Sequence, residues 1–104
     1  FNVLQIGGPD EPQLAATRTL PGSYFDSVRH VLGCRALIHT DTGMGWVASG
    51  YQHRQIGLYS HAYYGEDKVA NIQPQNPNGR YLSAGNVNEI ALDSIINQLT
   101  LLLS

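Results

Sequence analysis

The fold is decided by one stretch, residues 35–46, which reads Arg35-Ala36-Leu37-Ile38-His39-Thr40-Asp41-Thr42-Gly43-Met44-Gly45-Trp46. Its first part, residues 35–39, is short and mainly apolar, which predicts a buried β-strand. The polar and glycine-containing residues 40–45 predict a turn, and a short helix is expected over residues 46–51. A strand followed by a turn and a helix is typical of a parallel α/β sheet.

The flanking sequence extends this pattern in both directions. Further strands are expected at residues 1–6, 17–20 and 55–59, with an edge strand at 69–72. Helices are expected at residues 23–32, capped by Ser23, and at residues 86–103, capped by Asn86, while residues 60–84 read mostly as loop. The alternation predicts a Rossmann-like α/β fold with one parallel sheet of about four strands and flanking helices.

Composition excludes several classes of protein. The chain has 104 residues, of which 42% are hydrophobic and 13% charged, enough for one compact domain. A net charge of -2 without a basic cluster argues against nucleic-acid binding. The single cysteine, Cys34, cannot form an internal disulfide, and we interpret it as a small buried residue. The sequence shows no transmembrane segment and no signal peptide. It also has no metal-ligand spacing, and we expect neither a metal nor a cofactor.

The turn after the central strand carries the most informative chemistry. Helix amino termini suit phosphate because their first N–H groups lack intrahelical partners, and Gly43 and Gly45 allow close backbone approach. Asp41 would repel a phosphate, so we expect its carboxylate to accept hydrogen bonds from sugar hydroxyls. Gly8 and His61 also follow predicted strands and would lie on the same carboxyl-terminal edge of the sheet. The alternative that Asp41 or Thr42 only caps the helix stays open.

Two segments carry a resemblance to a known family. The first is Asp41-Thr42-Gly43-Met44-Gly45-Trp46-Val47-Ala48-Ser49-Gly50, followed by the apolar strand at residues 54–59. The second is Val3-Leu4-Gln5-Ile6-Gly7-Gly8 with Glu11, followed by Thr17-Arg18-Thr19-Leu20. In order and spacing they resemble the family-nine glycosyltransferases, the heptosyltransferases of bacterial lipopolysaccharide core synthesis. Trp46 replaces the family's histidine and Ser60-His61-Ala62 its Gly-Pro-Thr turn, which leaves the donor sugar open.

The resemblance implies a function and a set of site residues. The chain would be the donor-binding, carboxy-terminal half of a GT-B glycosyltransferase, which binds a nucleotide-diphosphate sugar without a metal. Asp41 would contact the donor sugar, Thr42, Gly43, Met44 and Gly45 its diphosphate, and Glu11 the ribose. A glycosyltransferase of lipopolysaccharide or another surface glycan would work in the cytoplasm, at the inner face of the cytoplasmic membrane as a peripheral protein.

The first residue also bears on the organisation of the chain. Phe1 opens an apolar run without a preceding methionine, so we expect residues 1–104 to be one nucleotide-sugar-binding domain truncated at its amino terminus. The resemblance implies that an amino-terminal acceptor domain supplies the catalytic base, so the chain alone would not catalyse sugar transfer.

Two other classes of function are open at this stage. Asp41-Thr42-Gly43 is also the active-site tripeptide of retroviral-type aspartic proteases, in which two subunits each contribute one carboxylate. Those proteases are mostly β, whereas this sequence predicts two substantial helices. The other alternative is a standalone α/β binding module.

Overall fold

The computed structural model describes residues 2–7, 14–15, 17–20, 22–65, 68–69 and 72–104. The chain divides into two compact units, Phe1–Gly33 and Cys34–Ser104. Gly8 and Glu11, two of the predicted site residues, lie outside the described residues.

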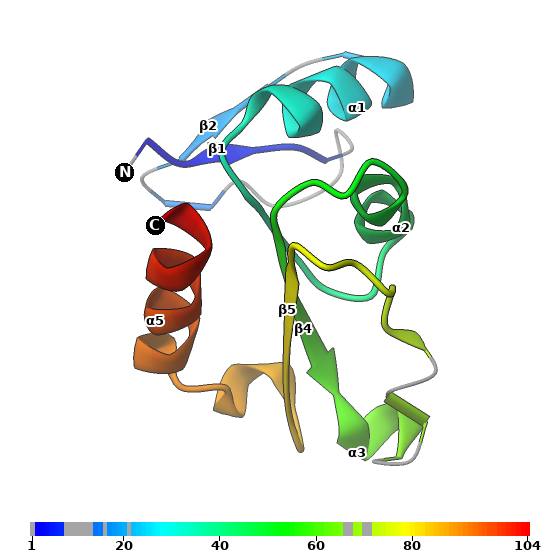
Figure 1. The fold of residues 1–104 in the computed structure, drawn as a ribbon, viewed down its shortest axis with the longest axis vertical. Helices are drawn as coiled ribbons and strands as arrows, with labels where there is room; N and C mark the ends of the chain where they lie inside the picture. Colours follow the sequence, from blue (N-terminus) through cyan, green and yellow to red (C-terminus); the bar gives the residue numbers. More distant parts are fainter. Residues whose placement is uncertain (1, 8–13, 16, 21, 66–67, 70–71) are drawn as a thin grey trace. The chain divides into compact units, whose positions relative to one another are not determined.

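The first unit contains a small parallel sheet. Strand β1 (Leu4–Gln5) pairs in parallel with β2 (Arg18–Thr19), as Figure 1 shows. The side chain of Gln5 holds the segment before β2 close to β1, because its Oε1 accepts hydrogen bonds from Leu14 N at 2.8 Å and Thr17 Oγ1 at 3.2 Å. Strands therefore lie within the expected ranges 1–6 and 17–20, but each spans two residues, and Phe1 is outside the described residues.

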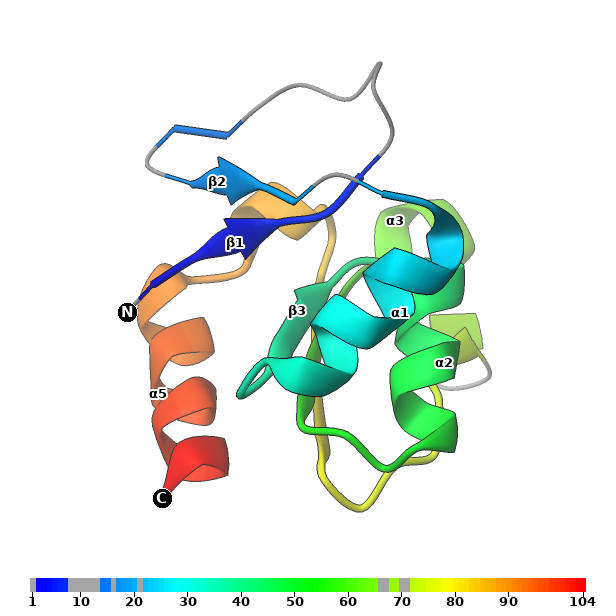
Figure 2. The same ribbon diagram turned by 90° about the horizontal axis from the view of Figure 1, so that it is seen from above.

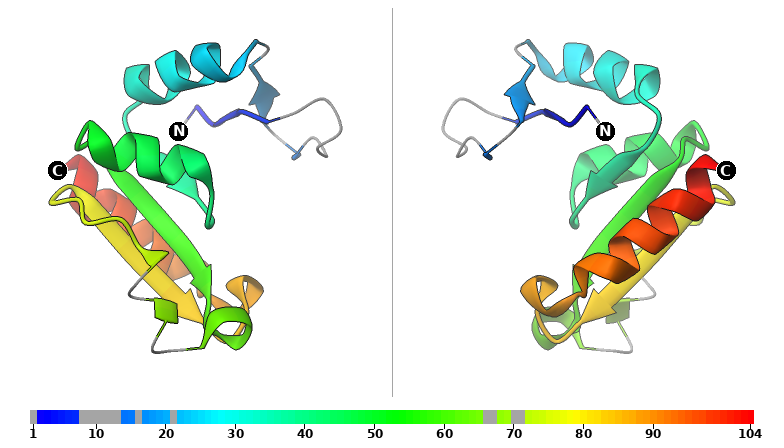
Figure 3. Two further views of the ribbon diagram at one scale, coloured as in Figure 1. Left: turned by 90° about the vertical axis from the view of Figure 1, so that its right-hand side faces the viewer. Right: turned by 90° about the vertical axis from the view of Figure 1, so that its left-hand side faces the viewer.

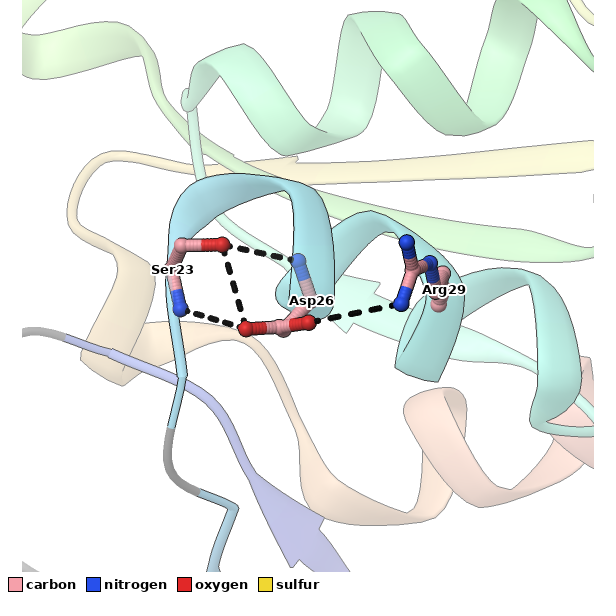
Figure 4. A network of polar contacts seen from close by, with 3 residues as sticks. All are labelled: Ser23, Asp26 and Arg29. Carbon is pink, nitrogen blue, oxygen red and sulfur yellow. Dashed lines mark hydrogen bonds and ion pairs between the residues drawn. The ribbon is translucent and has the colours of Figure 1, made fainter.

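Helix α1 (Tyr24–Gly33) begins with a reciprocal cap. Ser23 Oγ accepts from Asp26 N at 3.3 Å, while Asp26 Oδ2 accepts from Ser23 N at 2.9 Å (Figure 4). Arg29 extends the cluster, with its Nη1 3.6 Å from Asp26 Oδ1. The hydrogen bonds from Ser23 are the main reason that the pKa of Asp26 lies below its ordinary value. The cap predicted at Ser23 is confirmed, because it satisfies amides that a helix start leaves unpaired.

The second unit is built on a three-stranded parallel sheet. Its strands are β3 (Leu37–His39), β4 (Gln55–Ser60) and β5 (Gly79–Ala84), in the order β3-β4-β5. The registers pair Leu37 with Gln55 and Gln55 with Gly79. The α/β class with parallel strands is thus confirmed. The single sheet of four strands is not, because the described residues form one sheet of two strands and one of three.

The main error of the sequence prediction concerns the edge strand β5, which was not expected. Strand β5 lies in the segment 60–84 that we expected to be loop, together with helix α3 (His61–Tyr64). The edge strand expected at 69–72 is wrong, because Val69 and Ile72 are both helical. An edge strand has one neighbour and little buried surface, so β5 needs no apolar run, and the Asn- and Pro-rich residues before it resemble a loop.

Two helices cover opposite faces of the sheet in the second unit. Figures 2 and 3 show α2 (Gly43–Gly50) on one face and α5 (Leu92–Leu103) on the other. Side chains of a strand alternate between faces, so Gln55, Gly57 and Tyr59 point towards α2 while Ile56 points towards α5. Ile56 and Ala48 of α2 are completely buried. The face that supports α2 is therefore the polar one.

Both helix starts differ from the prediction. Helix α2 begins at Gly43 rather than at Trp46, so the two glycines belong to the helix. The helix expected over residues 86–103 is interrupted: Asn86 caps a 3-10 turn, η1 (Val87–Glu89), and α5 begins at Leu92. Ile90 and Ala91 have extended backbone angles, and these residues break the helix even though the apolar spacing runs through them.

Candidate functional site

The predicted phosphate turn lies at the carboxyl-terminal edge of the three-stranded sheet. Strand β3 ends at His39, residues 40–42 form the turn, and α2 starts at Gly43. Asp41, Thr42 and Gly43 are exposed, Met44 is half-buried and Gly45 is buried. The structure therefore keeps these five predicted site residues together, with the first three open to a ligand.

Thr42 occupies the residue position that caps α2, yet its side chain does not cap the helix. Its backbone is extended, with φ -141 and ψ 159, and its side chain makes no cap hydrogen bond. Its carbonyl oxygen accepts from Gly45 N at 3.2 Å. No acidic residue stands in the first turn of α2, so nothing in that turn offsets the positive end of the helix dipole. The alternative that the Thr42 side chain caps the helix therefore does not hold for its hydroxyl group.

Helix α2 packs closely on the sheet because its inner face is small. A β-carbon built at Gly45 would lie 2.6 Å from Nδ1 of His39 and closer still to Cε1 of that ring. Ala48, one turn further on, is fully buried against the same face. Glycine at position 45 is therefore required by the imidazole beneath it, independently of any ligand.

The polar face under α2 is organised by Gln55, whose side chain is completely buried. Its Nε2 donates to Nε2 of His39 at 2.7 Å and to the carbonyl oxygen of Gly45 at 3.1 Å. Its Oε1 accepts from Nδ2 of Asn76 at 2.6 Å and from the hydroxyl of Tyr81 at 3.4 Å. Every hydrogen-bonding position of this amide is used, as a buried polar group requires.

His39 is held as a neutral ring in one tautomer. Its Nδ1 lies 2.6 Å from the carbonyl oxygen of Thr40, which can only accept, so Nδ1 carries the proton. Its Nε2 must then accept from the Gln55 amide. Burial lowers the pKa of His39, against the opposing effects of the Thr40 hydrogen bond and of Asp41. His39 is therefore a buried histidine with a hydrogen-bond partner at each ring nitrogen.

Two tyrosines complete this face, each lying over a glycine two residues earlier in its own strand. A β-carbon at Gly57 would lie 2.7 Å from Cε2 of Tyr59, and one at Gly79 would lie 2.7 Å from Cζ of Tyr81. The Tyr59 ring meets His39 edge-on, with centroids 6.5 Å apart. Burial, together with smaller effects of Tyr81 and Asp41, raises the pKa of Tyr59 to about 12.

His61 stands further along the sheet than the phosphate turn. Register pairs the last residue of β3, His39, with Gly57, whereas β4 continues to Ser60. Three further residues correspond to about 10 Å along the strand. Ser60 Oγ donates to the carbonyl oxygen of Gly85 at 2.8 Å, which ties the start of α3 to the end of β5. His61 and Asp41 therefore both lie at the carboxyl-terminal end of the sheet, but they are displaced from each other along the strand direction.

Cys34 pairs with a histidine at the opposite, amino-terminal end of the strands. Its Sγ lies 3.2 Å from the carbonyl oxygen of Ala36 and 3.6 Å from Nε2 of His53. The thiol is half-buried, and burial raises its pKa, which favours the neutral thiol over the nucleophilic thiolate. Burial is also the main reason that the pKa of His53 is lowered.

The described residues contain no group of three or more His, Cys, Asp or Glu side chains that could hold a metal ion. Among the same residues, no helix has both the length and the apolar character required to cross a membrane. The helices α1, α2 and α5 and the parallel strands differ from the mostly β architecture that the aspartic-protease alternative expects. Comparison with protein-family models, with curated proteins and with solved structures found no match to this chain.

Sequence reasoning missed Gln55, Asn76 and the two tyrosines of this face. A signal for them was present as polar and aromatic residues that alternate with glycine, in Gln55-Ile56-Gly57-Leu58-Tyr59 and in Gly79-Arg80-Tyr81. Period-two spacing of such residues places them on one face of a strand.

Proposed function

We propose that the chain binds the donor of a glycosyltransferase, a nucleotide-diphosphate sugar, at the turn formed by Asp41, Thr42 and Gly43. The proposal assigns the fold to the Rossmann-like, donor-binding half of a GT-B enzyme, in keeping with the parallel α/β architecture. The observation that carries it is the exposed Asp41–Gly43 turn at the amino end of α2, where the Thr42 side chain makes no cap hydrogen bond.

The chemistry of this turn divides between two parts of the donor. The diphosphate would accept from the amides at the start of α2 and from the Thr42 hydroxyl, because a helix amino terminus favours an anion. Asp41 precedes these groups and would accept from hydroxyls of the sugar. During transfer, charge develops on the departing nucleoside diphosphate, and the same amides would stabilise it. We assign no catalytic base.

Binding can be followed through the chain's single tryptophan. Trp46 is 51% exposed in the first turns of α2, so its fluorescence reports on the neighbouring turn. The experiment is a fluorescence titration of the chain with a panel of nucleotide sugars and with the corresponding nucleoside diphosphates. We expect saturable binding of at least one nucleotide sugar, and a panel without any binding would contradict the proposal.

Two substitutions separate the assigned roles. Hydrogen bonds to charged groups contribute about 1.5–3 kcal/mol, so Asp41→Asn should weaken nucleotide-sugar binding by roughly tenfold or more. The same variant should bind the nucleoside diphosphate normally or more tightly, since a negative charge is removed. Thr42→Val should weaken both ligands. Asp93→Asn, on the exposed start of α5, is the matched control and should change neither affinity.

A further inference from the structure

The phosphate turn and the first residues of α2, Thr40–Gly45, are held at both ends by the same buried pair of side chains, His39 and Gln55. At its start, the carbonyl oxygen of Thr40 accepts from Nδ1–H of His39 at 2.6 Å. Three residues into α2, the carbonyl oxygen of Gly45 accepts from Nε2 of Gln55 at 3.1 Å. His39 and Gln55 are joined at 2.7 Å, so the two anchors of the turn form one connected unit.

The orientation of this pair is fixed from the far side. Asn76 Nδ2 donates to Oε1 of Gln55 at 2.6 Å and also to the carbonyl oxygen of His53 at 2.8 Å. Rotating the Gln55 amide by half a turn would bring its NH₂ group against the NH₂ group of Asn76. Gln55 can therefore only donate towards His39, and His39 can only accept at Nε2.

We propose that His39 and Gln55 act together as a positioning pair, which holds the Thr40–Gly45 turn in the conformation that binds a phosphate group of the donor. The identity of the ligand rests on the proposed function, whereas the positioning of the turn by His39 and Gln55 does not. Both residues are buried beneath the turn, so they act through the backbone at Thr40 and Gly45 and not by touching the ligand.

Protonation of His39 is the event that would break this arrangement. An imidazolium carries N–H at both nitrogens, so its Nε2–H would face the NH₂ group of Gln55 and the 2.7 Å contact would be lost. Among the described residues of the unit 34–104, the titratable groups around the ring are Asp41 of the turn, Tyr59 of β4 and, through Gln55, Tyr81 of β5. Helix α2, which packs directly on the ring, contributes no titratable side chain.

The first test uses the unmodified chain. Long-range ¹⁵N NMR of histidine side chains should find His39 in the Nδ1–H tautomer at neutral pH. On acidification, the amide resonances of the Thr40–Gly45 turn should shift with the same midpoint as the His39 ring. An Nε2–H tautomer, or turn amides that ignore the titration of His39, would overturn the positioning pair without any reference to ligand.

The second test changes the partner of His39. In Gln55→Glu, a carboxylate replaces the donor and can accept from Nε2–H, so the midpoint of the His39 titration should move to higher pH. The pH at which the chain loses ADP or UDP binding, read from Trp46 fluorescence, should move with it. Gln55→Met removes the anchor at Gly45 and leaves Nε2 of His39 without its partner, so it should lower nucleotide affinity about tenfold at neutral pH. Gln75→Glu and Gln75→Met, at an exposed glutamine, are the matched controls and should behave as wild type.

The outcomes separate the two proposals. Turn amides that follow His39 in a chain that binds no nucleotide would support the positioning pair and contradict the proposed function. Nucleotide binding whose pH midpoint stays in place in Gln55→Glu would contradict the positioning pair and leave the proposed function intact. The wild-type titration requires no substitution, so it decides the question even where a Gln55 variant does not fold.

Discussion

Adding one methyl group at Gly45 tests how closely α2 is bound to the sheet. A β-carbon at this position would lie 2.6 Å from Nδ1 of His39 and nearer to Cε1, well inside van der Waals contact. The ring cannot move freely, because Thr40 and Gln55 hold its two nitrogens. In Gly45→Ala, either the helix lifts from the sheet or the imidazole loses a hydrogen bond.

The size of the effect follows from these contacts. Forcing an extra carbon into a packed interior costs about 1–3 kcal/mol. A buried amide of Gln55 left without its acceptor costs about 1–3 kcal/mol more. Alanine is the better helix former by up to about 1 kcal/mol, which offsets part of this. We expect Gly45→Ala to lower the free energy of unfolding by about 2–4 kcal/mol.

The same helix provides the control. A β-carbon at Gly50 would meet nothing within 4 Å, so Gly50→Ala should leave stability unchanged or raise it by up to about 1 kcal/mol. Urea unfolding of both variants, followed by far-ultraviolet circular dichroism, gives the comparison. Equal stabilities of Gly45→Ala and Gly50→Ala, within about 0.5 kcal/mol, would refute the packing of α2 against His39.

Three further predictions concern pH and capping. Burial lowers the pKa values of His39 and His53, so the unfolded chain binds protons that the folded chain does not. Stability should therefore be full above about pH 6.5 and fall as the pH decreases through the lowered pKa values; a urea midpoint constant from about pH 7 to 5 would contradict this. The pKa of Tyr59 is raised from 10.0 to about 12, so its stabilising effect is complete below the unfolded pKa and lost as the pH rises through 12. A titration of phenolate absorbance should lose its highest step in Tyr59→Phe, and retention of that step would assign it to another tyrosine. Asn86→Ala removes the 3.1 Å hydrogen bond from Asn88 N and should cost about 1 kcal/mol in urea unfolding, while an unchanged midpoint would show that the cap contributes nothing.

The parts of the fold that the sequence predicted are those with a local cause. Ser23 and Asp26 form a cap within one helical turn, and the strand–turn–helix order at residues 37–50 follows from hydrophobic pattern and glycine placement. Strand β5 has no such local signal. It forms because its backbone pairs with β4 over its whole length, from Gln55 opposite Gly79 to Ser60 opposite Ala84.

The candidate site divides in the same way. Asp41, Thr42 and Gly43 follow one another in the chain, so a motif could indicate them together. Gln55 contacts His39, which lies 16 positions before it in the sequence, and Asn76, which lies 21 positions after it. The tertiary fold alone brings these side chains together. Even the requirement for glycine at position 45 has a tertiary cause, since the group that needs the space is the His39 ring.

The most direct test of the phosphate turn is a ¹H–¹⁵N NMR titration of the chain with nucleotide-diphosphate sugars. We expect saturable shifts centred on the amides of Thr42, Gly43 and Met44, which the nucleoside diphosphate reproduces and an equal concentration of sulfate does not. The Asp41 amide should respond further when the sugar is present. Shifts that centre on any other part of the chain, or that sulfate reproduces in full, would contradict the assignment of this turn as the nucleotide-sugar site.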